Sequence, residues 1–191
     1  MKPTRTPVAI GATVQLALLF SVLISRGAAQ AGEAAAPPAP VASIEISGAL
    51  PRRGVLTLPE LKKLGVTKAA WKSHGEQHEV TGVGLDKLLA KFGFEPGPMG
   101  KDVPKEEKRR GWRKVVVVSA RDGYAAVSSC AEVFQDMGAT RALVVWEIDG
   151  KPLSPDRGPL RLVVLTDKEP SRSIHGLTRL EIVDLTGKAP R

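Results

Sequence analysis

The stretch VVVVSARDGYAAVSSCAEVF, residues 115–134, holds the pattern that decides the fold class. The near-continuous apolar run over 114–119 predicts a strand that is covered on both faces. Asp122-Gly123 predicts a turn after it, and residues 124–129 return as a second strand. Residues 131–138, AEVFQDMG, predict a short helix that ends at its final glycine. Two adjacent strands followed by a short helix indicate a domain in which sheet dominates.

The residues that follow this stretch predict further strands. Residues 142–148 are mostly apolar and precede Asp149-Gly150, a dipeptide that is typical of tight turns. A proline-rich bend leads into a second apolar run over 160–165, and residues 177–185, LTRLEIVDL, predict a last strand. We therefore expect this half of the chain to complete the sheet.

The residues that precede it mix strands with short helices. Residues 43–48 alternate in polarity and predict a strand, and Thr57 is expected to cap a short helix that stops at Gly65. Residues 68–83 predict a hairpin that turns at Gly75, and residues 84–94, GLDKLLAKFGF, place leucines at helical spacing. Strands and helices do not alternate regularly, so the sequence predicts a β-rich α+β domain with a mixed sheet and not a doubly wound parallel sheet.

The first 31 residues have the composition of a secretory signal peptide. Lys2 and Arg5 precede an apolar run, and Ala29-Gln30-Ala31 is the small-x-small pattern after which signal peptidase cuts. We expect cleavage after Ala31, a periplasmic or secreted protein, and no stable membrane span after cleavage. A retained membrane anchor is the alternative. No pair of adjacent arginines precedes the apolar run, which favours export as an unfolded chain over the twin-arginine route.

The remaining boundaries follow from composition. Residues 32–42 are rich in alanine and proline and predict an extended linker. We expect one folded domain over 43–185 and a short C-terminal tail over 186–191. A domain of this length can bury one core without disulfides, and the single cysteine of the chain, Cys130, cannot form an internal bridge.

The positive charge is concentrated in one segment. The chain holds 28 basic and 20 acidic residues, and removal of three basic residues with the signal peptide leaves 25 against 20, a net charge of +5. Residues 101–114, KDVPKEEKRRGWRK, hold seven of the basic residues and three acidic ones. We expect a solvated loop, which leaves attraction to an acidic partner or a membrane surface open. Trp112 is its one aromatic residue, a pattern that disfavours a nucleic-acid partner.

Three blocks in this order carry a family resemblance. They are GVGLDKLLAKFGF at 82–94, SARDGYAAVSSCAEVF at 119–134, and WEIDGKPLSPDRGPLRLVVLTDKEPSRSIHGLTRLEIVDL at 146–185. Together they resemble the oxidoreductase molybdopterin-binding domain, the central domain of the sulfite oxidase family. The resemblance covers about residues 43–185 and implies the same fold, with molybdopterin as the cofactor that the family would bring.

The same resemblance raises the question of the metal ligand. Catalytic members hold molybdenum through a cysteine thiolate in the region that corresponds here to about 69–79, and this chain reads AAWKSHGEQHE there. Catalytic members also contribute an Asn-His-type segment near their start that contacts the pterin, whereas this domain begins directly with its first strand. Cys130 is the one candidate thiolate left. Its alternative role is that of a small buried apolar side chain.

The resemblance also implies candidate binding residues. The segment after the 160–165 run contacts the pterin phosphate in the family, so Arg172, Ser173 and His175 are candidates for anion binding. Asp122 and Tyr124 are further candidates for cofactor binding by the same resemblance, with a turn that only shapes the pocket as the alternative. His74 and His78 bracket the Gly75 turn and need not share a face, so we expect no zinc or copper site, with surface histidines as the simpler interpretation.

These observations support two main functional hypotheses, beside a third in which the chain is an adaptor that docks another exported protein through the basic segment 101–114. The first is an exported binding or redox-partner module that lacks the molybdenum ligand and holds a small anionic ligand or another exported protein. The second is a molybdopterin-dependent oxidoreductase of the sulfite oxidase type, with Cys130 on the metal.

Overall fold

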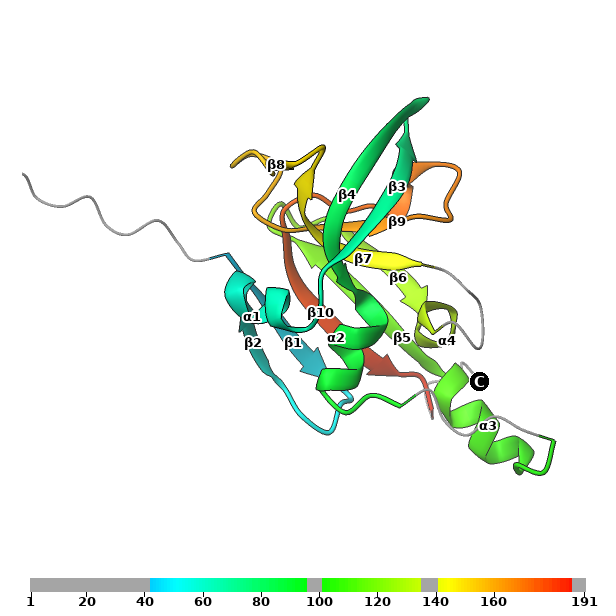
Figure 1. The fold of residues 1–191 in the computed structure, drawn as a ribbon. Coiled ribbons are helices and arrows are strands. Elements are labelled where there is room, and N and C mark those ends of the chain that lie inside the picture. Colours follow the sequence, from blue (N-terminus) through cyan, green and yellow to red (C-terminus); the bar gives the residue numbers. More distant parts are fainter. Residues whose placement is uncertain (1–41, 96–100, 135–140, 187–191) are drawn as a thin grey trace, which may run out of the picture. The chain divides into compact units, whose positions relative to one another are not determined.

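The computed structural model describes residues 42–95, 101–134 and 141–186, which all belong to one compact unit of the chain. Its elements are organised as two five-stranded sheets with short helices packed beside them (Figure 1). This confirms the predicted α+β class. The predicted signal peptide and most of the linker lie outside the described residues. Within the described residues, no helix combines the length and the apolar character that crossing a bilayer requires.

The first sheet has the strand order β2-β1-β10-β5-β6. Only the pairing of β1 with β10 is parallel, and all other neighbours in this sheet are antiparallel. The bounds of the five strands are β1 Ser43–Gly48, β2 Gly54–Thr57, β5 Lys114–Ala120, β6 Ala125–Ser129 and β10 Leu177–Asp184. The sheet therefore joins the first and the last strand of the domain.

The second sheet has the order β3-β4-β7-β8, and β9 also pairs with β7. All of these pairings are antiparallel. The bounds are β3 Thr67–Ser73, β4 Glu76–Gly84, β7 Ala142–Ile148, β8 Lys151–Pro152 and β9 Arg161–Val164. One apolar cluster packs side chains of both sheets and of the helices together, and a smaller cluster with Trp71 and Val163 covers the other face of this sheet. The predicted buried strand over 142–148 is thereby confirmed.

The helices are short, and their ends follow local chemistry. They are α1 Leu58–Lys63, α2 Leu85–Lys91, α3 Lys105–Trp112 and α4 Cys130–Val133, with a 3-10 turn, η1, at Pro170–Arg172. Thr57 caps α1 as predicted, and its backbone N–H donates to the Glu60 carboxylate over 2.7 Å. Gly93 takes a positive φ of 79° after α2, a conformation that glycine adopts without steric cost.

Three expectations about local structure were wrong. The segment 101–114 is not only a loop, because α3 forms inside it, starting after Pro104 with two glutamates in its first turn. The helix that begins near Cys130 ends at Val133, and Gly138 lies outside the described residues. Strand β5 is fully covered on one face only, because Val115 and Val117 are half-buried while Val116 and Val118 are buried.

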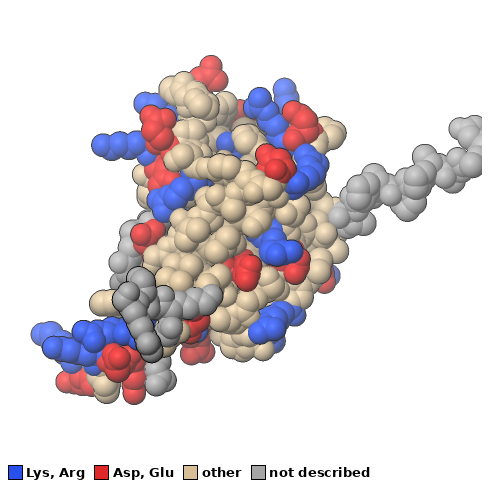
Figure 2. All heavy atoms as spheres, turned by 180° about the vertical axis from the view of Figure 1, so that it is seen from behind, with Lys and Arg blue, Asp and Glu red and all other residues tan. Residues whose placement is uncertain are grey.

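The surface around α3 carries both signs of charge. Figure 2 shows basic and acidic side chains gathered together at one end of the visible face. Glu106 of α3 lies 3.5 Å from Arg109 in the same helix and 3.7 Å from Arg113 just after it, so part of the positive charge is matched locally. Trp112 is 51 % exposed. The segment is therefore a solvated charged helix, and the partner expected for it remains a prediction.

Candidate functional site

Two adjoining cavities lie where the β3–β4 hairpin, β9 and the segment after η1 meet. The first has a volume of about 310 Å³ and the second about 330 Å³. His74, Arg161 and His175 line both of them. Such volumes suit a small ligand or one part of a larger one. These two cavities form the candidate site.

Turns and strand ends place the polar side chains around the first cavity. The Asp122 carboxylate accepts the Tyr124 backbone N–H over 2.9 Å, which closes the turn between β5 and β6. The Tyr124 hydroxyl donates to the Ser171 carbonyl over 2.9 Å and so ties this turn to η1. Ser173 is buried, and its Oγ accepts the Val164 N–H over 3.2 Å, which leaves its own proton available for a ligand.

The structure brings together four of the five predicted binding residues. Asp122, Tyr124, Ser173 and His175 all line the first cavity, although they come from two segments that are distant in the sequence. The fifth, Arg172, is not among the residues that line either cavity. Their role in cofactor binding stays a prediction.

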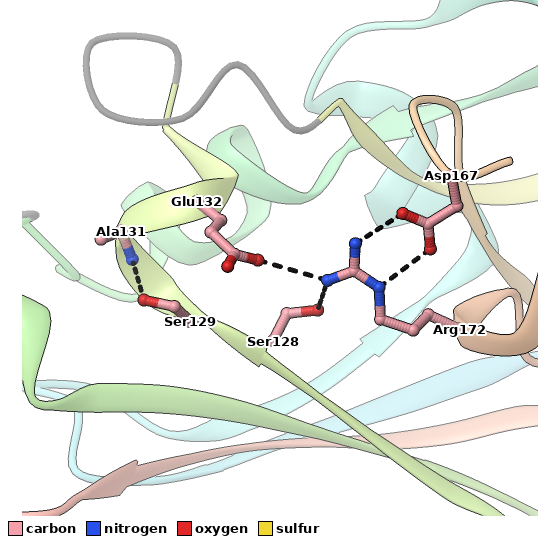
Figure 3. Close-up of polar contacts among 6 residues, drawn as sticks. All are labelled: Ser128, Ser129, Ala131, Glu132, Asp167 and Arg172. Carbon is pink, nitrogen blue, oxygen red and sulfur yellow. Dashed lines mark hydrogen bonds and ion pairs between the residues drawn. The ribbon is translucent and has the colours of Figure 1, made fainter.

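Arg172 is held instead by neighbouring side chains (Figure 3). Its Nε donates to Asp167 Oδ2 over 2.8 Å while its Nη2 donates to the other carboxylate oxygen, a bidentate pair. Its Nη1 lies 3.2 Å from Glu132 Oε2 and 3.3 Å from Ser128 Oγ. Hydrogen bonds and charge from Asp167 raise the pKa of Arg172, against a smaller opposing effect of burial. Its guanidinium therefore joins η1 to β6 and α4.

Arg161 is the basic residue that sequence reasoning missed. It lies at the start of β9, is 7 % exposed, and lines both cavities. Its guanidinium carbon lies 4.5 Å from the centre of the Trp71 ring, a cation–π contact. Burial, with a further contribution from Arg157, lowers the pKa of Arg161 to about 10. The available signal was a single arginine inside the apolar run LRLVVL, where an unpaired charge is costly.

Three buried polar atoms around this site have no hydrogen-bond partner among the described residues. They are Arg161 Nε, Trp71 Nε1 and His175 Nδ1. All three residues line the second cavity. Buried polar groups are nearly always paired, and a group without a partner costs about 1–3 kcal/mol. Their convergence on one cavity indicates a place where a ligand or bound water supplies the missing partners.

The three histidines lie around one cavity. His74 and His78, which the hairpin did not require to lie together, both line the second cavity with His175. The His74 backbone has a positive φ of 50° at the hairpin turn, which directs the chain back toward β4. His78 Nδ1 lies 2.8 Å from Asp149 Oδ2. Even so, the part of the chain that the structure describes contains no group of three histidine, cysteine or carboxylate side chains that could hold a metal ion.

Cys130 lies in the apolar core. It is 0 % exposed, and it starts α4 after Ser129, whose Oγ accepts the Ala131 N–H over 3.2 Å. Burial raises the pKa of the Cys130 thiol to about 12, although Lys114 has a smaller opposing effect. Cys130 is not among the residues that line the two cavities. These properties favour the simpler interpretation of Cys130 as a small apolar side chain.

Comparison with known families identifies the domain. The family model described as "Oxidoreductase molybdopterin binding domain" matches residues 57–189. The chain belongs to this family. The match spans most of the molybdopterin-binding domain described above, from the cap of α1 to beyond β10, and confirms the resemblance inferred from the three sequence blocks. No curated protein matches the chain in sequence.

Solved structures show the same fold. One similar structure is the sulfane dehydrogenase SoxCD from Paracoccus pantotrophus, with a TM-score of 0.56 and 18 % identity. The aligned region covers 75 % of this chain and 38 % of that chain. At this identity the likeness establishes the molybdopterin-binding fold alone.

The side chains present fit part of the family's ligand. Arg161, Ser173 and His175 place buried or half-buried hydrogen-bonding groups beside the two cavities, as the anionic portion of a molybdopterin would require. The segment 69–79 contributes Ser73, His74 and His78 to the second cavity but no thiol. The residues therefore fit the anion, and no cysteine on these walls is available to hold a metal.

Proposed function

We propose that this chain is an exported binding module of the molybdopterin-binding family that holds an anionic ligand in the two cavities around Arg161. The observation that carries this proposal is Arg161, a buried residue with 7 % of its surface exposed, whose guanidinium lies between the two cavities. Its buried Nε has no partner in the described residues, and the one charge that lowers its pKa further is that of Arg157. A buried charge of this kind is stable only when an opposite charge neutralises it.

The ligand that fits is a small anion or the phosphate end of a pterin. Arg157 and Arg161 supply positive charge to the second cavity, and Ser173 has a hydroxyl proton to donate in the first. A planar guanidinium can hold two oxygens of a phosphate or sulfate group. The module then works as a carrier or redox partner without turnover of its own, because neither cavity offers a thiolate.

Chemical analysis of the native protein tests this proposal. The protein would be purified from its native exporting host and assayed for molybdenum and pterin. We expect less than stoichiometric molybdenum, together with binding of sulfate or phosphate that competes with any pterin present. Stoichiometric molybdenum would contradict the non-catalytic part of the proposal. Absence of any anion or pterin binding would contradict the binding part.

The second candidate is a molybdopterin-dependent oxidoreductase of the sulfite oxidase type, which the family match favours. Replacement of Cys130 by serine separates the two. An enzyme that used Cys130 as a metal ligand would lose its molybdenum and its activity in Cys130→Ser, whereas a binding module would lose only stability. The complete burial of Cys130 and its raised pKa support a loss of stability alone, the outcome expected for a binding module.

A further inference from the structure

The second cavity gathers every histidine of the chain beside two arginines. His74, His78 and His175 are the three histidines in the sequence, and all of them line it together with Arg157 and Arg161. Histidine is the side chain whose ordinary pKa lies within the physiological range. A proton taken up by one of these side chains would add to the positive charge that Arg157 and Arg161 give the cavity.

His175 is the histidine most closely bound to the site. It is half-buried between Ile174 and Gly176, and its Nδ1 is buried without a hydrogen-bond partner among the described residues. The charged groups that act on it come from three segments: Arg161 from β9, Arg157 and Asp156 from the bend before β9, and Asp122 from the β5–β6 turn. His74 and Glu76 face the same cavity from the hairpin.

These surroundings disfavour the protonated form of the imidazole in the free protein. Burial lowers the pKa of His175, the charges of Arg161 and Arg157 lower it further, and Asp122 and Asp156 compensate only in part. A neutral imidazole offers one donor and one acceptor, whereas a protonated one offers two donors and a positive charge. An anion bound next to it would gain from that change.

We infer that the cavity binds its anion together with one proton, which His175 takes up. This inference rests on the proposed function, because it concerns the same anion beside Arg161. The bound negative charge offsets the two arginines that disfavour the imidazolium, so the proton and the anion favour each other's binding. The coupling is reciprocal, as thermodynamic linkage requires.

The sign of the pH dependence follows directly. The anion raises the pKa of His175 from its lowered value in the free protein. Affinity for the anion therefore increases as pH falls through the pKa of the bound form, and it levels off below the pKa of the free form. Each unit of difference between these two values corresponds to a tenfold change in affinity.

The other two histidines are poorer candidates for this proton. His78 Nδ1 already contacts the Asp149 carboxylate at 2.8 Å, a partner that is present with or without a ligand. His74 is exposed at the hairpin turn, where water screens its interaction with a bound anion. His175 combines burial, an unpartnered ring nitrogen and a place on the walls of both cavities.

Sulfate is the appropriate probe because it stays a dianion from about pH 5 to about pH 8, where histidine titrates. The imidazole signals of the full chain would be followed by NMR over this range, with and without saturating sulfate. We expect sulfate to raise the pKa of His175. The dissociation constant of sulfate should fall about tenfold from the alkaline to the acidic end of this pH range. This measurement needs no variant.

Two variants locate the coupling. His175→Gln keeps a hydrogen-bonding side chain but cannot titrate, and it should bind sulfate with an affinity independent of pH. The matched variant His78→Gln retains His175 and should retain the pH dependence. Circular dichroism would establish that each variant is folded.

The outcomes separate this inference from the proposed function. Sulfate that binds the parent protein with an affinity independent of pH would overturn the proton coupling and leave the anion site in place. A pH dependence that survives in His175→Gln, or disappears in His78→Gln, would likewise overturn it. Sulfate that fails to bind at any pH would contradict the proposed function itself.

Discussion

Two arginines in this domain lie in opposite electrostatic surroundings. The Arg172 side chain is 32 % exposed and faces Asp167 and Glu132, so two carboxylates match its charge. Arg161 is far more buried, stacks on Trp71, and has Arg157 as the charge that most affects it. The family resemblance predicted that Arg172 binds the anion, whereas the buried polar atoms without partners indicate Arg161.

The difference shows how a binding charge can be told from a structural one. A guanidinium whose donors are already satisfied by the protein gains little from a ligand, which must compete with those partners. A buried guanidinium without a counter-charge is destabilising on its own and is retained where something else neutralises it. The set of hydrogen-bond partners therefore separates the two roles, and sequence position alone does not.

Replacement of Arg161 should have the largest effect on binding. Arg161→Met keeps the apolar stem against Trp71 and removes the charge, so we expect sulfate affinity to fall by more than about tenfold. The free energy of unfolding should stay within about 1 kcal/mol of that of the parent. Removal of an uncompensated buried charge stabilises the fold, and this offsets the loss of the cation–π contact. Calorimetric titration and urea unfolding measure the two effects, and unchanged affinity would contradict the assignment of Arg161.

Replacement of Arg172 should show the opposite pattern. Arg172→Met leaves the Asp167 side chain, which is 13 % exposed, without its bidentate partner. We expect the free energy of unfolding to fall by about 1–3 kcal/mol and the sulfate affinity to stay within about twofold. If instead Arg172→Met loses sulfate and keeps its stability, the roles of the two arginines are reversed and the original sequence prediction stands.

The local fold was predictable where neighbouring residues determine it. The cap at Thr57, the hairpin around Gly75 and the turn at Asp149-Gly150 depend on a few adjacent residues, and all three lie where the sequence placed them. Helix α3 was missed because its sequence has almost no apolar side chains to mark a buried face. Its acidic first turn was the signal that was available.

The site was harder to predict because it depends on partners from distant segments. Glu132 reaches Arg172 only once the fold brings together two segments that are 40 residues apart in the sequence, so the sequence could not show that this carboxylate occupies the arginine. Arg161 stands out as a charge inside an apolar run, but only the fold shows that β9 places it beside Trp71 of the hairpin. The order of the strands, including the parallel pair of β1 with β10, is likewise not encoded in any local pattern.

Cys130 offers a further test of helix α4. This helix begins at Cys130 and carries Glu132, which pairs with Arg172. A structural thiol with a pKa of about 12 should not react with a thiol reagent at neutral pH until the protein unfolds. We expect Cys130→Ser to lower the free energy of unfolding by about 1–2 kcal/mol, and Cys130→Ala to have a smaller effect, because serine buries an extra polar group. Rapid labelling of the native protein would show that this region is not purely structural.

The smallest expected effect is on the pH dependence of the stability of the protein. It comes from His175, the histidine proposed to take up the proton. The pKa of His175 is below its ordinary value of 6.5 in the folded protein, so its contribution to stability is present above 6.5 and declines as pH falls through that value. Sulfate should oppose this decline, because it raises the pKa of the folded form. Thermal unfolding at about pH 7.5 and about pH 5.5 should therefore show a larger stabilisation by sulfate at the acidic value. In His175→Gln the stabilisation by sulfate should be equal at the two pH values. Arg172→Met should show the same pH dependence as the parent, because Arg172 is paired with Asp167 and Glu132 and does not act on the anion.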